Sequence, residues 1–182
     1  MPCNNASKIA SLSNTLRAFI MRFSSGLLCL AALGTASVAV GAAADQWPVS
    51  PQRASLETPY GTLAVRPSDY MYGATLTFNH TPTTPRLQGV LNIPYAYEVG
   101  RQQMALVSLD NGQTNCPISF YWVVISEQGY RITDPFGSCS NDIRMSAKGR
   151  ILRMETPDPA NPDKLDIWEF DGQKVYKRAP RP

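Results

Sequence analysis

Short runs of β-branched and aromatic residues, separated by turn-forming residues, follow one another along the chain from residue 60 to residue 177. Such runs predict β-strands, because alternate side chains of a strand point to opposite faces of a sheet. After residue 44 no segment keeps a helical period, and the chain's 15 prolines and 12 glycines interrupt any long helix. The pattern therefore predicts an all-β fold, a single small sandwich or twisted meander of about eight or nine short antiparallel strands.

The most apolar segment of this region is the run 118–125. Its alternate residues Phe120, Trp122 and Val124 are apolar, and so are the residues between them. A strand of this kind buries both of its faces, which is typical of a strand in the middle of a fold. We therefore expect residues 118–125 to form the central strand.

The chain's last strands are predicted from the dipeptide Asp171-Gly172, which separates the candidate strands 165–170 and 173–177. A two-residue type I′ turn needs a positive φ at both of its central positions, and Asp-Gly is a dipeptide that adopts such angles readily. The resulting register places Glu169 opposite Lys174 and Trp168 opposite Val175. Prolines predict surface loops elsewhere, at 79–85 and 156–164.

The N-terminal residues have the composition of a secretory signal peptide. Basic residues precede an uncharged, mostly apolar stretch at 26–40, and the alanines at 42–44 are small residues of the kind that signal peptidase accepts. A true start at Met21 would give a leader of the usual size. The apolar stretch is too short and too weakly apolar for a membrane anchor, so we expect no membrane span after cleavage.

The expected organisation is a signal peptide at 1–44, an extended lead-in at 45–58, a β domain at 59–178 and a tail at 179–182. Removal of the leader changes the charge balance. The full chain has 17 basic and 14 acidic residues, and three of the basic ones lie in the leader, so 14 of each sign remain. Nucleic-acid binding needs a clustered excess of lysine and arginine, and we therefore expect no nucleic-acid partner.

Only Cys116 and Cys139 remain as thiols after the leader. Cysteines pair in the oxidising compartments to which a signal peptide directs a chain. We therefore expect a Cys116–Cys139 disulfide, which closes a loop of about 24 residues and stabilises the fold by about 3 to 4 kcal/mol.

Three short motifs carry a resemblance: Asn-Cys-Pro at 115–117, Phe-Gly-Ser-Cys-Ser-Asn at 136–141 and Phe-Asp-Gly at 170–172. Together they resemble a group of small exported proteobacterial proteins of unassigned function, in which the second cysteine usually sits in a Phe-Gly-Thr-Cys-Ser-Asp setting. Ser138 and Asn141 are conservative departures from that setting. The resemblance covers about residues 60–175 and implies export from the cytoplasm of a Gram-negative bacterium, to the periplasm or beyond, and the disulfide. It carries over no catalytic residues.

Catalytic and metal chemistry has little support in the sequence. His80 is the only histidine, and no Gly-x-Ser-x-Gly nucleophile setting accompanies it. One histidine and two paired cysteines do not make a usual zinc site. We expect no cofactor and assign no catalytic, cofactor-binding or metal-binding residue. Hydrolysis by a pair of carboxylates remains an alternative, because the distance between two carboxylates cannot be read from the sequence. The candidates are Asp69, Asp134, Asp142 and Asp158.

Two tyrosine pairs at strand spacing, Tyr70 with Tyr72 and Tyr95 with Tyr97, place each pair on one face of a strand. Such tyrosines either belong to the core or line a recognition surface. The sequence thus favours an exported, non-enzymatic β-domain binding protein, of the inhibitor or immunity type, with a protein or glycan partner in the bacterial envelope. The alternative is a cell-envelope hydrolase that uses paired carboxylates.

Overall fold

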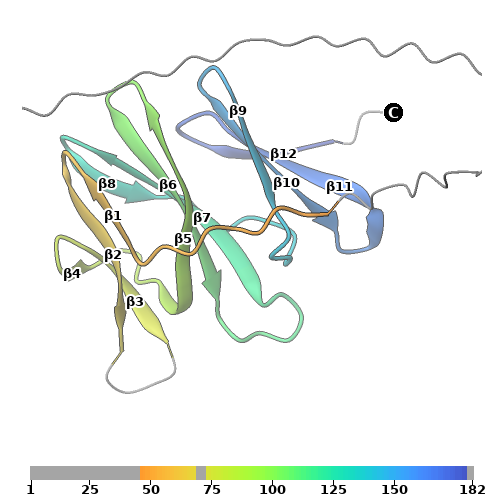
Figure 1. Ribbon diagram of the computed structural model, residues 1–182, viewed down its shortest axis with the longest axis horizontal. Helices are drawn as coiled ribbons and strands as arrows, with labels where there is room; N and C mark the ends of the chain where they lie inside the picture. Colours follow the sequence, from red (N-terminus) through yellow and green to blue (C-terminus); the bar gives the residue numbers. More distant parts are fainter. Residues whose placement is uncertain (1–45, 69–72, 180–182) are drawn as a thin grey trace, which may run out of the picture. The chain divides into compact units, whose positions relative to one another are not determined.

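The computed structural model describes residues 46–68 and 73–179, and the predicted leader lies outside this part of the chain. The regular structure of the described residues is entirely β, as Figure 1 shows. Twelve antiparallel strands form two sheets, which confirms the all-β prediction. The strands outnumber the eight or nine expected, because short edge strands and a longer hairpin add to the predicted set.

The large sheet has the strand order β1-β2-β3-β5-β6-β7-β8, and β4 pairs with β3. Each strand runs antiparallel to its neighbour. The strands are β1 (Ser55–Thr58), β2 (Gly61–Pro67), β3 (Ala74–Phe78), β4 (Thr81–Pro82), β5 (Gln88–Val99), β6 (Gln102–Asp110), β7 (Ile118–Ser126) and β8 (Gly129–Ile132).

The small sheet is built from the C-terminal third of the chain, in the order β12-β11-β10-β9. Its strands are β9 (Arg144–Lys148), β10 (Ile151–Asp158), β11 (Asn161–Phe170) and β12 (Val175–Arg178). The β11 residue Phe170 stacks on Trp122 of β7, with ring centroids 5.1 Å apart and an interplanar angle of 9°. This aromatic pair joins the cores of the two sheets.

Strand β7 lies between β6 and β8 and is buried on both faces, as its apolar pattern predicts. Phe120, Trp122 and Val124 face a core cluster that includes residues of β10 and β11 in the small sheet. Val123 and Ile125 face a second cluster, formed with residues of β2, β3, β5 and β6. Because its two faces belong to different clusters, β7 stabilises both cores. Burial of each large apolar side chain contributes about 1.5 to 3 kcal/mol.

The predicted disulfide is present between Cys116 and Cys139, whose Cα atoms are 4.7 Å apart. It ties the chain just before β7 to the segment that follows β8. This segment returns along β7, where Phe120 and Phe136 exchange backbone hydrogen bonds of 2.9 and 3.0 Å. The bridge therefore fixes the connection between the two sheets.

The lead-in that precedes residue 59 is bonded to the large sheet. Asn92 of β5 accepts a hydrogen bond from the Arg53 backbone N–H at 2.8 Å and donates to the Pro51 carbonyl at 3.0 Å. Farther along, β1 pairs with β2. The lead-in thus occupies the side of β5 that β3 leaves open, because β3 pairs with β5 only at Gln88 and Gly89.

The expected loop at 156–164 is wrong, because β10 and β11 continue through most of it as a hairpin. Asp158 closes the turn: its Oδ1 accepts hydrogen bonds from the backbone N–H groups of Ala160 at 2.7 Å and Asn161 at 3.2 Å. The register shifts between Pro157 and Asp158, and such an irregularity is where a strand tolerates proline.

The predicted register of the last hairpin is also wrong. Phe170 pairs with Val175 and Trp168 with Lys177, so residues 171–174 form a four-residue connection in place of a two-residue turn. Asp171 explains the difference, because its carboxylate accepts hydrogen bonds from two backbone N–H groups of the connection and holds it open. Glu169 consequently lies opposite Tyr176, and its carboxylate forms an ion pair with Arg178, at 2.6 Å, and not with Lys174.

Candidate functional site

The two described tyrosines of the predicted binding surface lie on β5 and are half-buried. Both pack against the core cluster between the sheets, and the Tyr97 ring lies 6.2 Å from that of Trp122. Burial raises the pKa of Tyr97 above 10.0, and the nearby Tyr95 hydroxyl raises it further. Tyr95 and Tyr97 thus pack part of their side-chain surface against the core. Tyr70 and Tyr72 lie outside the described residues, so a surface shared by all four tyrosines stays a prediction.

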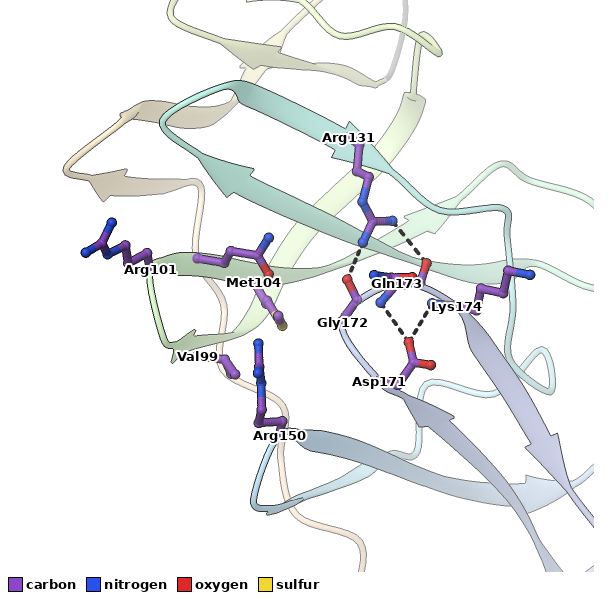
Figure 2. A pocket seen from close by; sticks show the side chains of 10 residues that line it. Val99, Arg101, Met104, Arg131, Arg150, Asp171, Gly172, Gln173 and Lys174 are labelled. Carbon is purple, nitrogen blue, oxygen red and sulfur yellow. Dashed lines mark hydrogen bonds between the residues drawn. The ribbon is translucent and has the colours of Figure 1, made fainter.

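A hollow of about 630 Å³ lies where turns and strand ends from both sheets meet (Figure 2). Four segments line it: the β5–β6 turn with the start of β6, strand β8, the β9–β10 turn and the β11–β12 connection. We call it the cationic hollow, and its residues are Val99, Arg101, Gln102, Met104, Arg131, Arg150, Asp171, Gly172, Gln173 and Lys174.

Positive charge dominates this hollow, with four basic side chains against one carboxylate. The ion pairs in the described part of the chain leave these four unpaired and use other basic residues, namely Arg144, Arg153, Lys177 and Arg178. A site lined by one sign of charge attracts ligands of the opposite sign. The hollow is therefore suited to an anionic group.

Asp171, the one carboxylate, is engaged by its own connection. Its Oδ1 accepts hydrogen bonds from the backbone N–H groups of Gln173 at 2.7 Å and Lys174 at 2.8 Å, and its Oδ2 accepts one from the Tyr176 hydroxyl at 3.1 Å. These bonds, chiefly the one from Lys174, hold the pKa of Asp171 below 3.8. Its charge orders the connection and makes no ion pair with the four cations in the described structure.

Arg131 links the two sheets at the hollow. Its guanidinium donates to the carbonyls of Gly172 and Gln173, the latter at 3.1 Å. The acceptors are neutral carbonyls, so these bonds fix the position of the guanidinium without pairing it with a negative charge. Gly172 is buried there with φ +94, and a Cβ on it would lie 3.3 Å from the Met104 Cε, so the connection approaches the floor closely.

The remaining cations differ in how they are placed. Figure 2 shows Arg150 directed from the β9–β10 turn toward Met104, while Arg101 and Lys174 point outward at the rim. Met104 is buried and, with Val99, gives the hollow an apolar floor. The four basic residues of the hollow are exposed, so their charges are accessible to an incoming anion.

The carboxylates proposed for hydrolysis do not come together in the described structure. Asp134 and Asp142 line different hollows, and Asp158 closes the β10–β11 turn. Asp69 lies outside the described residues. Asp142 shares its hollow, of about 410 Å³, with a carboxylate that the sequence analysis did not select, Asp110.

His80 lies in a tight turn between β3 and β4, exposed, with its Nδ1 3.3 Å from an Arg66 nitrogen. Within residues 46–68 and 73–179, no group of three or more histidine, cysteine, aspartate or glutamate side chains is placed to hold a metal ion. In the same residues no helix is long and apolar enough to cross a membrane.

The cationic hollow could not be predicted from the sequence, because its charges come from four segments spread between residues 101 and 174. One signal was present. Arg101 and Arg150 each follow a turn glycine with a positive φ, Gly100 and Gly149, and Lys174 follows Gly172 by two positions. Basic residues that follow turn glycines come close together when the hairpin turns that carry them lie at the same end of the fold.

Comparisons of the chain with protein-family models, with curated proteins and with solved structures found no significant match.

Proposed function

We propose that this chain is an exported, non-enzymatic binding domain of the bacterial envelope, and that its cationic hollow receives an acidic segment of a protein partner. The observation that carries the proposal is the set of four unpaired cations around a single engaged carboxylate. The leader-like N-terminus and the disulfide support export.

The size and setting of the hollow are those of a ligand-binding site. Its volume of about 630 Å³ lies within the range of about 300 to 1,000 Å³ that is typical of ligand sites. Turns on a rigid sheet scaffold are common positions for binding residues. Arg131 is held in place before any ligand arrives, which lowers the entropy that binding must cost.

The balance of charge favours a protein segment over a long polyanion or a membrane surface. The chain beyond the predicted leader carries 14 basic and 14 acidic residues, so its positive charge is local. Nucleic acids and anionic membranes are bound by broad basic surfaces. A hollow with few cations and an apolar floor matches a carboxylate group on a partially apolar surface.

Calorimetric titration of the mature protein with a glutamate-rich peptide tests the proposal, with the glutamine version of the same peptide as the ligand control. Only the glutamate peptide is expected to bind, and less tightly as salt rises. Arg150→Glu should weaken binding about tenfold or more, because it removes a charge-assisted contact and adds repulsion. Arg86→Glu is the matched control, since Arg86 is exposed and does not line the hollow. Equal losses in the two variants, or stronger binding to a heparin fragment or to anionic vesicles, would contradict the proposal.

A second candidate function, a hydrolase with paired carboxylates, rests on the hollow that Asp110 and Asp142 share with Trp47. Paired carboxylates beside an aromatic ring suit a glycan. Assays of peptidoglycan and glycan cleavage with Asp110→Asn and Asp142→Asn test it. Cleavage at the wild-type rate by both variants, or none by the wild type, would remove this candidate.

A further inference from the structure

A second hollow, of about 450 Å³, adjoins the cationic hollow. The two share Arg131, Gln173 and Lys174, so the Arg131 contact with the β11–β12 connection stands between them. We call it the aromatic hollow, because Phe136 and Trp168 line it together with Val175.

The aromatic side of this hollow is fixed in position. The rings of Phe136 and Trp168 have centroids 5.8 Å apart, and the Trp168 Nε1 donates a 3.3 Å hydrogen bond to the Ser138 Oγ. Lys177 lies over the Trp168 ring, 5.5 Å from its centroid. Aromatic side chains held in this way act as anchors for apolar groups, since little rotamer freedom is lost when a ligand binds.

The two hollows differ in charge. Asp134, which is exposed, lines the aromatic hollow but not the cationic hollow, and Arg150 lines only the cationic hollow. Arg131 and Lys174 line both hollows, so an acidic side chain meets two cations and one carboxylate in the aromatic hollow but four cations and one carboxylate in the cationic hollow. It is therefore attracted more strongly to the cationic hollow. An apolar side chain has the opposite preference, because Phe136, Trp168 and Val175 add apolar surface to the aromatic hollow.

We infer that the acidic segment bound by this chain is an extended peptide that places a carboxylate in the cationic hollow and a large apolar side chain, one or two residues away, in the aromatic hollow. The inference rests on the proposed function, since it assumes that the cationic hollow takes an acidic protein segment. An extended peptide matches the arrangement, because its neighbouring side chains diverge and can enter two adjoining hollows on either side of the Arg131 contact.

Three blocked peptides of equal length test the inference by calorimetric titration of the mature protein. The first has two glutamates followed by a leucine, the second has serine in place of the leucine, and the third keeps the leucine but has glutamines in place of the glutamates. The first is expected to bind about tenfold more tightly than the second, the gain for burying one leucine side chain. The third is expected to bind weakly or not at all.

Variants then assign each part of the peptide to its hollow. Val175→Ser should remove most of the tenfold advantage of leucine over serine, and Arg150→Glu should weaken both glutamate peptides by a similar factor. Should Val175→Ser unfold, nuclear Overhauser contacts between the leucine methyl groups and the wild-type Trp168 ring give the same information. Equal affinity of the leucine and serine peptides, or leucine contacts away from Phe136, Trp168 and Val175, would overturn this inference and leave the proposed function standing. If neither glutamate peptide binds, the proposed function itself fails.

Discussion

Ser138 donates a 2.5 Å hydrogen bond to the Asp166 carboxylate, and this contact joins the disulfide-bonded segment to β11 of the small sheet. Both side chains are buried. Asp166 also pairs with Lys177 of β12 at 2.7 Å, and Ser138 also accepts the indole N–H of Trp168. The residue before the second cysteine therefore anchors the crossing between the two sheets and orients one wall of the aromatic hollow.

Replacement of Ser138 by alanine should lower the free energy of unfolding by about 1.5 to 3 kcal/mol, because a buried carboxylate and an indole each lose a partner. Denaturant unfolding measures the loss. Ser146→Ala is the matched control, since Ser146 is exposed on β9, and it should change stability by less than about 0.5 kcal/mol. Equal effects of the two substitutions would show that the Ser138–Asp166 bond contributes nothing to stability.

The disulfide should contribute much of the total stability. Cys116 and Cys139 are 23 positions apart, and a closed loop of this length is worth about 3 to 4 kcal/mol against a typical total of about 5 to 15 kcal/mol. Replacing both cysteines by serine should lower the denaturant midpoint accordingly. Mass labelling of the denatured, unreduced protein should find no free thiol. Two labelled thiols, or an unchanged midpoint in the double variant, would contradict this account.

Stability should fall as the pH rises above 10.0, because burial raises the pKa values of Tyr97 and Tyr121. The sign follows from proton binding: above pH 10.0 the unfolded chain loses these phenolic protons while the folded chain keeps them, so unfolding becomes easier with rising pH. Denaturant unfolding at pH values from 9 to 12 measures the effect. The double variant Tyr97→Phe with Tyr121→Phe should flatten the curve, and an equally steep curve would show that these hydroxyls are not its source.

Asp171→Asn should increase the affinity of the cationic hollow for a glutamate peptide by about two- to fivefold, because the one negative charge is removed. Asparagine keeps an oxygen for the N–H groups of Gln173 and Lys174, so the connection should stay folded.

The dependence of stability on acidic pH gives a second measurement for the same variant. The lowered pKa of Asp171 contributes stability that is present above pH 3.8 and is lost as the pH falls through the folded-state value, and Asp171→Asn should lack this loss. Calorimetric titration and acid unfolding check the two parts, and an unchanged affinity would contradict the first.

The burial of both faces of β7 and the disulfide could be predicted because each depends on one strong local signal. Apolar residues at consecutive positions 120–125 leave no face for solvent, and β7 indeed contributes to two cores. Once the predicted leader is set aside, Cys116 and Cys139 leave only one pairing, which the structure confirms.

The C-terminal register could not be predicted, because the observed pairing differs from the expected one by two residues. A shift of one residue moves every side chain to the other face, but a shift of two keeps the same residues on the same faces. The apolar pattern therefore fits both registers equally. The choice is made by Asp171, whose side chain holds a four-residue connection and brings Phe170 opposite Val175.

The hairpin at 156–164 was missed for a related reason. Prolines exclude a regular strand, but they are tolerated where the pairing is irregular, and the register shift at Pro157 is such a place. The cationic hollow depends on tertiary structure still more strongly, because Arg101, Arg131 and Arg150 meet only after two sheets have packed together.

The most direct test is a nuclear magnetic resonance titration of the isotope-labelled protein with the glutamate peptide. The account predicts that the largest chemical-shift changes fall on the backbone amides of residues 99–104, of Arg131, of residues 149–151 and of residues 171–174, which lie far apart in sequence and meet at the cationic hollow. The glutamine peptide should leave these signals unchanged. No shift with the glutamate peptide, or shifts centred on the hollow of Asp110 and Asp142, would contradict the assignment of the cationic hollow as the binding site.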